Sequence, residues 1–267
     1  MSARVLIILA AFLFAANQSA SATDQNAAAL RAHQFTVLRG TVVENYDGER
    51  LGTLKDFVLA ASSGKVEFAL IKSGGIGPIS KERIVPSFCL SLNSVKEDTL
   101  SLDVTDTRWG AAPVFKRKHL QDLGNPAARH EVAGFYHFTG DTARAEQDAA
   151  GSLTPTGPAS QAPAQNQKML LASELVGRGI VNQSHKCLGK VCNLLIDASS
   201  TRDSFIVFSA PGFAKNHAFA IPFKSIQESD KGNLMVKLNE DDLAGAPLFD
   251  CTKPEEAAVY RYDVSGK

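Results

Sequence analysis

The chain has 267 residues, 44% of them hydrophobic, and its 28 basic residues are balanced by 28 acidic ones. This balance argues against a nucleic-acid binder, because such proteins use a basic stripe to neutralise phosphates. The one basic run, residues 116–119, is typical of a solvated turn, so we expect no nucleic-acid partner.

The N-terminus has the order of regions found in secretory signal peptides. Arg4 precedes an apolar run from Val5 to Ala16, and Ala20 and Ala22 form a small-residue cleavage site. The run is shorter than the roughly 20 residues that a membrane-spanning helix needs. We therefore expect a signal peptide over residues 1–22 and a mature protein that is periplasmic or secreted, with no transmembrane segment after cleavage.

Two stretches of the sequence match at an offset of 137 residues, as between Gly40 and Gly177. A repeat of this period indicates a duplicated module, each copy the size of one small domain. With small register shifts the match continues through Val85-Pro86 against Ile221-Pro222. The positions aligned without a shift include Leu38-Arg-Gly40 with Leu175-Val-Gly177, Asn45 with Asn182, Leu51-Gly52 with Leu188-Gly189, and Phe68 with Phe205.

Residues 34–123 are predicted to form the first module, built of short strands. Leu100–Val104 alternates apolar and polar residues, as a half-buried strand must, and Asp47-Gly48 supplies a hairpin turn. Short strands joined by tight turns, with little helix between them, indicate a small antiparallel β-barrel. The predicted strands are Val37–Asn45, Leu51–Ala60, Val66–Lys72, Arg83–Val85 and Leu100–Val104.

Residues 169–251 are predicted to repeat this architecture, so the fold class is mainly β, with two small barrels. The predicted strands of the second module are Gly179–Asn182, Leu188–Asp197, Phe205–Ser209, Ala218–Ile221 and Leu234–Leu238. Between the modules, residues 139–167 are rich in Ala, Gln, Gly, Pro and Ser. Such a composition buries too little apolar surface to order itself, so we predict a disordered linker that tethers the barrels without fixing their orientation.

Each module ends in a short helical segment followed by aromatic residues. In residues 124–138, Asn125 is the predicted cap and Pro126 the first helical residue, and the tail at residues 252–267 has the same plan. Two interpretations stay open: the aromatic side chains pack on their own barrel, or they present anchors to a protein partner. The candidate binding residues are Phe135, Tyr136, Tyr260 and Tyr262.

A set of positions spread over each module resembles the PRC-barrel family. They are Gly40, Asn45, Gly48-Glu49, Leu51-Gly52, Leu54, Asp56, Val58-Leu59, Val85-Pro86 and Ala112-Pro113-x-Phe115 in the first copy. The second copy loses the Asp-Gly turn and carries Asn193 in place of Asp56. The resemblance implies a tandem of small barrels used for protein contacts, with no shared catalytic residues.

The four cysteines, Cys89, Cys187, Cys192 and Cys251, allow three pairings in an oxidising compartment. Cys187 and Cys192 flank a predicted turn into a strand, so a local disulfide between them is one candidate. Cys89 and Cys251 would then form the second bond. In the first copy Arg50 and Lys55 stand in place of Cys187 and Cys192, and the joint change favours a pair.

The same segment offers an alternative function. His185, Cys187 and Cys192 are three soft ligands that could hold zinc or copper. Their spacing is not that of a zinc finger, a fourth ligand requires the approach of His217, and a disulfide would consume both thiols. We therefore assign no metal and no cofactor, and keep a ligand- or metal-binding role as the second candidate.

The sequence does not bring together a nucleophile with a base, or a pair of catalytic carboxyl groups. We therefore predict that the protein is not an enzyme. The favoured interpretation is a non-enzymatic exported module that binds another protein of the cell envelope. The alternative is a small-ligand or metal-binding periplasmic protein that uses the turn at Cys187 and Cys192.

Overall fold

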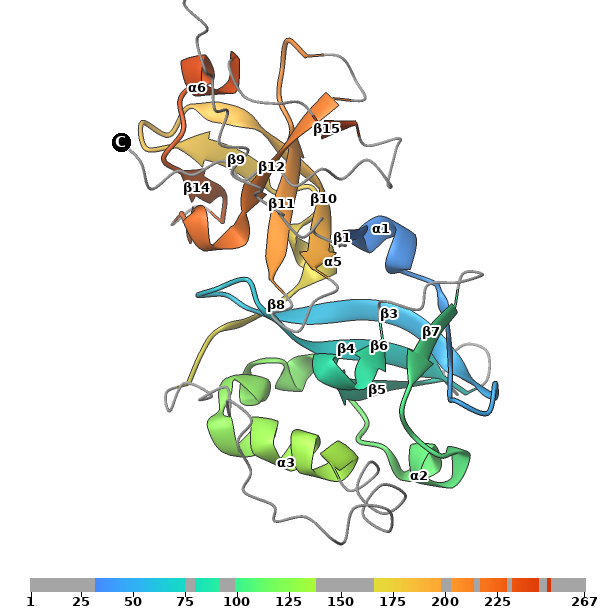
Figure 1. The fold of residues 1–267 in the computed structure, drawn as a ribbon. Coiled ribbons are helices and arrows are strands. Elements are labelled where there is room, and N and C mark those ends of the chain that lie inside the picture. The colour runs from blue at the N-terminus through green and yellow to red at the C-terminus, as the bar shows by residue number, and fades with distance from the viewer. Residues whose placement is uncertain are drawn as a thin grey trace, which may run out of the picture.

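The computed structural model describes residues 32–74, 80–91, 99–137, 166–197, 203–213, 217–229, 232–244 and 249–250. These residues form two β-sheets, one for each predicted module, with short helices around them (Figure 1). The predicted mainly β fold with two small barrels is therefore confirmed. The predicted signal peptide lies outside the described residues, as do most of the predicted linker and the C-terminal tail.

The sheet of the first module has the strand order β5-β4-β3-β2-β7-β6. The chain continues from β5 into β6 through the 3-10 turn η2 (Ser87–Cys89), so the two ends of this order are joined and the sheet closes as a small barrel. Its strands are β2 (Val42–Glu44), β3 (Arg50–Ala60), β4 (Val66–Ser73), β5 (Lys81–Pro86), β6 (Leu90–Ser91) and β7 (Thr99–Leu102).

The second module follows the same plan, with η5 (Phe223–Ser225) in the place of η2. Its sheet has the order β13-β14-β9-β10-β11-β12-β15. The strands are β9 (Gly179–Asn182), β10 (Cys187–Asp197), β11 (Ser204–Ser209), β12 (His217–Pro222), β13 (Ile226–Glu228), β14 (Leu234–Val236) and β15 (Phe249–Asp250).

One strand pair in each barrel is parallel, unlike the antiparallel pairing expected from the sequence. In the first barrel β2 and β7 are parallel, and in the second β9 and β14 are. Strands β2 to β5 alternate in direction, β6 continues the course of β5, and β7 turns back. Because β7 then runs the same way as β2, the last contact that closes the barrel has to be parallel.

The short helices are found at the ends of the strands and between the modules. The predicted helix after Asn125 is present as α3, and the Asn125 side chain accepts a hydrogen bond from the Ala127 N–H at 2.8 Å. The helical segments are α1 (Phe35–Leu38), α2 (Asp106–Ala111), η3 (Arg117–His119), η4 (Gln121–Gly124), α3 (Pro126–His137), α5 (Ala172–Leu175) and α6 (Glu240–Ala244). None of the helices in the described part of the chain is long and apolar enough to cross a membrane.

The Leu-Gly pair of the repeat is explained by a close approach between neighbouring strands. A side chain on Gly52 would place its Cβ 2.3 Å from the Lys72 carbonyl oxygen, and one on Gly189 would lie 2.0 Å from the Ser209 carbonyl oxygen. A Cβ at that distance would push the strands apart. Glycine at both positions therefore lets β3 approach β4 in the first barrel, and β10 approach β11 in the second.

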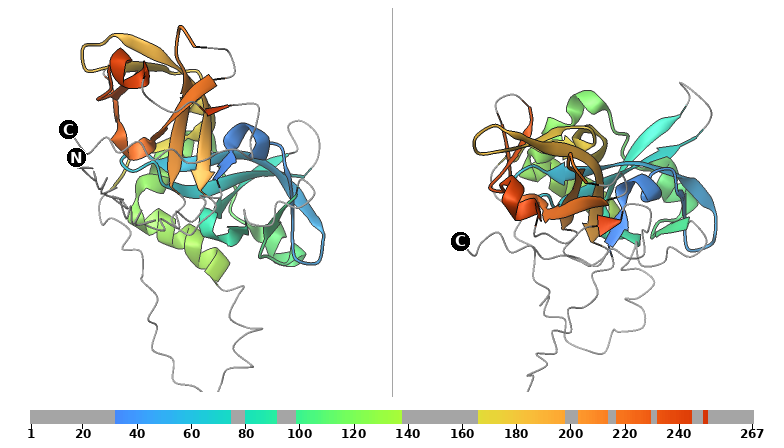
Figure 2. Two further views of the ribbon diagram at one scale, coloured as in Figure 1. Left: turned by 45° about the horizontal axis from the view of Figure 1, so that its top comes forward. Right: turned by 90° about the horizontal axis from the view of Figure 1, so that it is seen from above.

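The modules pack together, a point that the sequence left open. Buried apolar residues of both modules belong to one continuous cluster. In addition, the short strand that precedes each module pairs with a strand of the other one, as Figure 2 shows for β1 (Ala32–Gln34) in blue against the second module. These two pairings fix how the barrels sit on each other.

Candidate functional site

Two short segments cross between the modules, and we call them the first arm (residues 32–38, β1 and α1) and the second arm (residues 169–175, β8 and α5). Strand β8 (Met169–Leu171) of the second arm pairs with β3 of the first module, Leu171 opposite Val58. Strand β1 of the first arm pairs with β10 of the second module, Gln34 opposite Leu195. Leu171 and Leu195 lie 137 residues after Gln34 and Val58, so the two strand pairs match each other at the offset of the sequence repeat. The two contacts are therefore related by the duplication. We call this contact region the joint.

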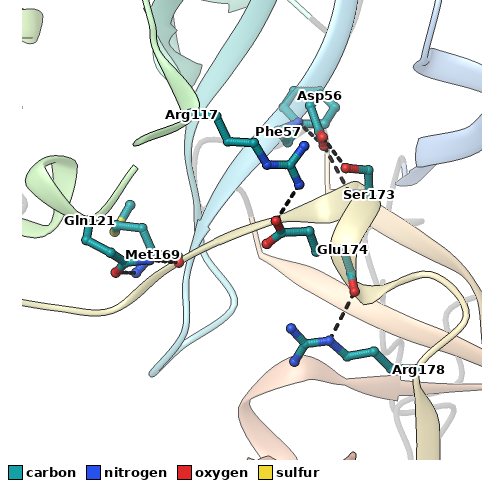
Figure 3. A network of polar contacts seen from close by, with 8 residues as sticks. All are labelled: Asp56, Phe57, Arg117, Gln121, Met169, Ser173, Glu174 and Arg178. Carbon is teal, nitrogen blue, oxygen red and sulfur yellow. Dashed lines mark hydrogen bonds and ion pairs between the residues drawn. The ribbon is translucent and has the colours of Figure 1, made fainter. Parts of the chain in front are cut away.

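Asp56 lies at the centre of the contact that the second arm makes. It follows a register shift in β3, and 5% of its surface is exposed. Its carboxylate accepts hydrogen bonds from the backbone N–H of Ser173 at 3.1 Å, from the Ser173 hydroxyl, and from the N–H of Phe57 at 2.9 Å (Figure 3). Burial raises the pKa of Asp56, although these hydrogen bonds act in the opposite direction.

Asn193 occupies the equivalent place in the second module. Its side-chain oxygen accepts hydrogen bonds from the N–H groups of Thr36 at 3.2 Å and of Leu194 at 2.9 Å. Its amide nitrogen donates to the Thr36 hydroxyl at 2.7 Å and to the Gln34 side-chain oxygen at 2.8 Å. The exchange of Asp56 for Asn193, which read as a departure from the repeat, therefore preserves the same arm contact with a neutral side chain.

These contacts explain why residues 35–38 form a turn of helix instead of the predicted strand over Val37–Asn45. The first N–H groups of a helix lack partners within the helix and need an acceptor from elsewhere. For the first arm this acceptor is Asn193, which is 157 residues away from Thr36. A prediction from local sequence cannot include such a partner.

Charged side chains surround the arm at its exposed edge. Glu174 of α5 pairs with Arg117 of η3 at 2.5 Å, and the Glu174 carbonyl accepts a hydrogen bond from Arg178 at 3.0 Å (Figure 3). Arg178 also pairs with Glu228 at 3.1 Å, and Glu228 receives Lys168 as a second partner. These cations lower the pKa of Glu228. The positive and negative groups compensate each other here, so the region is no basic docking site.

Two further contacts close the joint. The Gln121 side chain pairs with both backbone groups of Met169, at 2.9 Å and 3.1 Å, and so covers the outer edge of β8. The turn after β3 lies against the second module, because the Ser204 hydroxyl donates to the Gly64 carbonyl at 2.6 Å. A Cβ on Gly64 would lie 2.3 Å from the side chain of Phe223. The two modules are therefore in tight contact at this turn.

Of the predicted aromatic anchors, the first pair packs on its own barrel. Tyr136 is 2% exposed, its hydroxyl donates to the Ile84 carbonyl at 2.9 Å, and burial raises its pKa. Phe135 is half-buried, with the guanidinium of Arg108 5.0 Å above its ring. Packing on the barrel was one of the two interpretations for this tail. Tyr260 and Tyr262 lie outside the described residues, so their role as anchors stays a prediction.

The predicted disulfide between Cys187 and Cys192 is wrong. Both residues lie on the one strand β10, which has no turn between them. Five residues of extended chain span about 16 Å, whereas bonded cysteines need Cα atoms within about 7 Å. None of the cysteines in the described ranges is bonded to another. Burial raises the pKa of the Cys89 thiol to about 12, and its proposed partner Cys251 lies outside the described residues.

The same strand geometry disfavours the alternative metal site. Cys187 is exposed near the start of β10, while Cys192 is half-buried and its thiol contacts the Val207 carbonyl at 3.4 Å. His185 lies in the preceding turn, with a φ of 60°. Within the described ranges no group of three His, Cys, Asp or Glu residues could hold a metal ion. His217 belongs to β12, where only its backbone is described.

The sequence did not identify the exposed apolar residues of the surface. Tyr46 is 72% exposed at the turn between β2 and β3, and Phe88 is 56% exposed in η2. The turn itself is held by Asn45, whose side-chain oxygen accepts hydrogen bonds from the N–H groups of Asp47 and Glu49 at 3.0 Å and 2.8 Å. An aromatic residue next to an Asp-Gly turn is the signal that could have indicated Tyr46.

Comparison with known proteins identifies one family. The sequence model for the PRC-barrel domain matches the chain twice, over residues 32–106 and 167–243, which together are more than half of its length. Each match begins at or just before an arm, so the arm is part of the domain. A search of the curated proteins gave no match.

Proposed function

Because the chain belongs to the PRC-barrel domain family, we propose that it is a non-enzymatic interaction module that is exported and binds a protein of the cell envelope. The observation that carries the proposal is the tandem of two such domains joined into a single body by reciprocal arms. A rigid pair of barrels presents two related but unequal surfaces in a fixed arrangement. Such an arrangement suits the binding of one partner at two places.

The candidate contact residues are aromatic side chains: Tyr46, which is exposed, and two that the sequence suggests. Tyr46 projects from a turn whose backbone is fixed by Asn45, so that little conformational entropy would be lost on binding. Tyr260 and Tyr262 remain candidates from the sequence. Tyr136 is not one of them, because binding through its side chain would require α3 to leave the barrel.

The experiment that tests this proposal is crosslinking in intact cells. A photo-reactive residue is placed at Tyr46 in one variant and at Tyr260 in another, and at Glu131, on the exposed side of α3, as the matched control. We expect one abundant envelope protein to be captured from position 46 or 260 and not from 131. Capture of the same proteins from all three positions, or of none, would contradict a specific interaction.

Export is tested separately. The expected mature N-terminus is Thr23, directly after the predicted cleavage site at Ala22. N-terminal sequencing of the protein from fractionated cells checks this, and an intact Met1 in the cytoplasmic fraction would contradict it. The ligand- or metal-binding alternative is not favoured, because Cys187 and Cys192 are kept apart by the extended strand β10.

A further inference from the structure

We propose that the joint also forms between two copies of the chain, in a dimer in which each first module pairs with the second module of the other copy. This inference does not depend on the proposed envelope partner. It starts from the arms, because each arm contacts the opposite module and could as well come from a different polypeptide. An element that docks on a separate module is the feature from which exchanged dimers arise.

The contacts of the joint are independent of how the modules are connected. Ser173 and Asp56, Thr36 and Asn193, and Ser204 and Gly64 each unite one residue of the first module with one of the second. A dimer with exchanged modules would keep all of these bonds, twice over. The free energy of this dimer therefore differs from that of two monomers only through the connection between the modules, residues 138–165.

The connecting segment decides which form is favoured. The N–H of Gln167 donates to the Gly124 carbonyl at 3.1 Å, directly before α3 begins at Pro126. Helix α3 then runs for 12 residues, or about 18 Å, so the chain has to return over about that distance. Residues 138–165 provide 28 residues for this return, and they can reach about 90 Å. Closure within one copy is therefore unstrained, and its high effective concentration favours the monomer in dilute solution.

Removal of the connecting segment tests the proposal in the otherwise complete chain. Deletion of residues 138–165 leaves only Asn166 between His137 and Gln167, so these two residues can lie at most about 7 Å apart. Closure within one copy needs them to be separated by about 18 Å, the length of α3. We expect this variant to be a folded dimer at micromolar concentration by light scattering. The matched control deletes residues 148–161 only, leaves a reach of about 46 Å, and is expected to stay a monomer.

A folded monomer after the full deletion would overturn the proposal. An unfolded or aggregated product would do so as well, because the exchanged dimer retains every contact of the joint. A dimer of both deletion variants would also count against it, since dimerisation would then not depend on the reach of the segment.

A charge exchange shows whether the dimer uses this joint. Arg117 of one module pairs with Glu174 of the other across the joint. The variants R117E and E174R are each made in the chain that lacks residues 138–165. A dimer of two R117E copies then brings two acidic side chains together at the joint, and a dimer of two E174R copies brings two basic ones together. In a mixed dimer of the two variants both contacts become opposite in charge. After the variants are unfolded and refolded together, we expect the mixed dimer to exceed the statistical share of about one half in native mass spectrometry. A mixed share at or below one half would reject the arm-exchanged arrangement.

Discussion

Asp56 and Asn193 make the same contact with side chains of nearly the same shape, but only one of them titrates. Each holds the first turn of an arm through a backbone N–H and a hydroxyl group, of Ser173 and Thr36 respectively. Burial of a charged carboxylate costs much more hydration free energy than burial of a neutral amide. The stability of the first module therefore depends on pH through Asp56. In the second module, neutral Asn193 makes the same contact without this dependence.

Exchange of Asp56 for Asn should remove this pH dependence. Burial raises the pKa of Asp56 above its ordinary value of 3.8, so the native state binds more protons than the unfolded one. Its contribution to the free energy of unfolding is then greatest below pH 3.8 and falls as the pH rises through the native pKa. We expect the free energy of unfolding of D56N minus that of the wild type to increase from pH 4 to pH 7 in urea titrations.

The matched control is D56A, which leaves the N–H of Ser173 without its acceptor. It should lower the free energy of unfolding by about 1–3 kcal/mol at every pH. A D56N variant as unstable as D56A, or a difference that shrinks with rising pH, would show that the carboxylate itself is needed.

Gly64 is the residue at which a single methyl group should disturb the joint. It has a φ of +73°, and a Cβ would meet the side chain of Phe223 at 2.3 Å. We expect G64A to lower the free energy of unfolding by about 2–5 kcal/mol, the combined cost of left-handed backbone and overpacking. Gly48 has a similar φ of +79° with no atom within 4 Å, so G48A should cost about 1–2 kcal/mol. Equal effects of the two substitutions would contradict the tight contact.

At the scale of elements, sequence and structure agree where local pattern decides and differ where a distant segment does. The alternation at residues 100–104 predicted a strand, and β7 is present there with Leu100 and Leu102 buried. The sequence did not predict that each arm pairs with the other module. An apolar strand shows the same sequence pattern whether it pairs within its own module or with the other one. Cys187 and Cys192 were misread as flanking a turn, although the predicted strand Leu188–Asp197 already contained Cys192. In the structure this strand begins one residue earlier and runs through both cysteines.

Truncation of a core side chain in either barrel should have a large effect. Leu102 is fully buried and Val236 is 2% exposed, while Ser101 on the opposite side of β7 is half-buried. We expect L102A or V236A to lower the free energy of unfolding by about 2–4 kcal/mol, and S101A to change it by less than about 0.5 kcal/mol. Urea denaturation measures all three. Equal and small effects would contradict the inward orientation of these side chains.

At the scale of the molecule, the duplication produced two modules that depend on one another. Each barrel obtains from the other a short strand that extends the pairing of its long strand, β3 or β10. It also obtains hydrogen-bonding partners for a buried Asp or Asn. A module without the opposite arm would expose that strand edge and an unsatisfied side chain. The composition of residues 139–167 predicted a linker, but the orientation of the modules is set by contacts that the linker does not make.

Cleavage of the connecting segment should therefore leave the molecule in one piece. With a protease site inserted after Ala150, the two halves are expected to elute together at micromolar concentration and to have the mass of the uncut chain. Moderate salt should not separate them, because the ion pair between Arg117 and Glu174, which crosses the joint, has side-chain exposures of 67% and 33%, and exposed pairs contribute little. The G64A change should promote separation of the cut halves, and G48A should not, because only Gly64 lies in the joint. Halves that separate on cleavage without any substitution would mean that the arms dock too weakly to hold the barrels, and that the linker supplies their association after all.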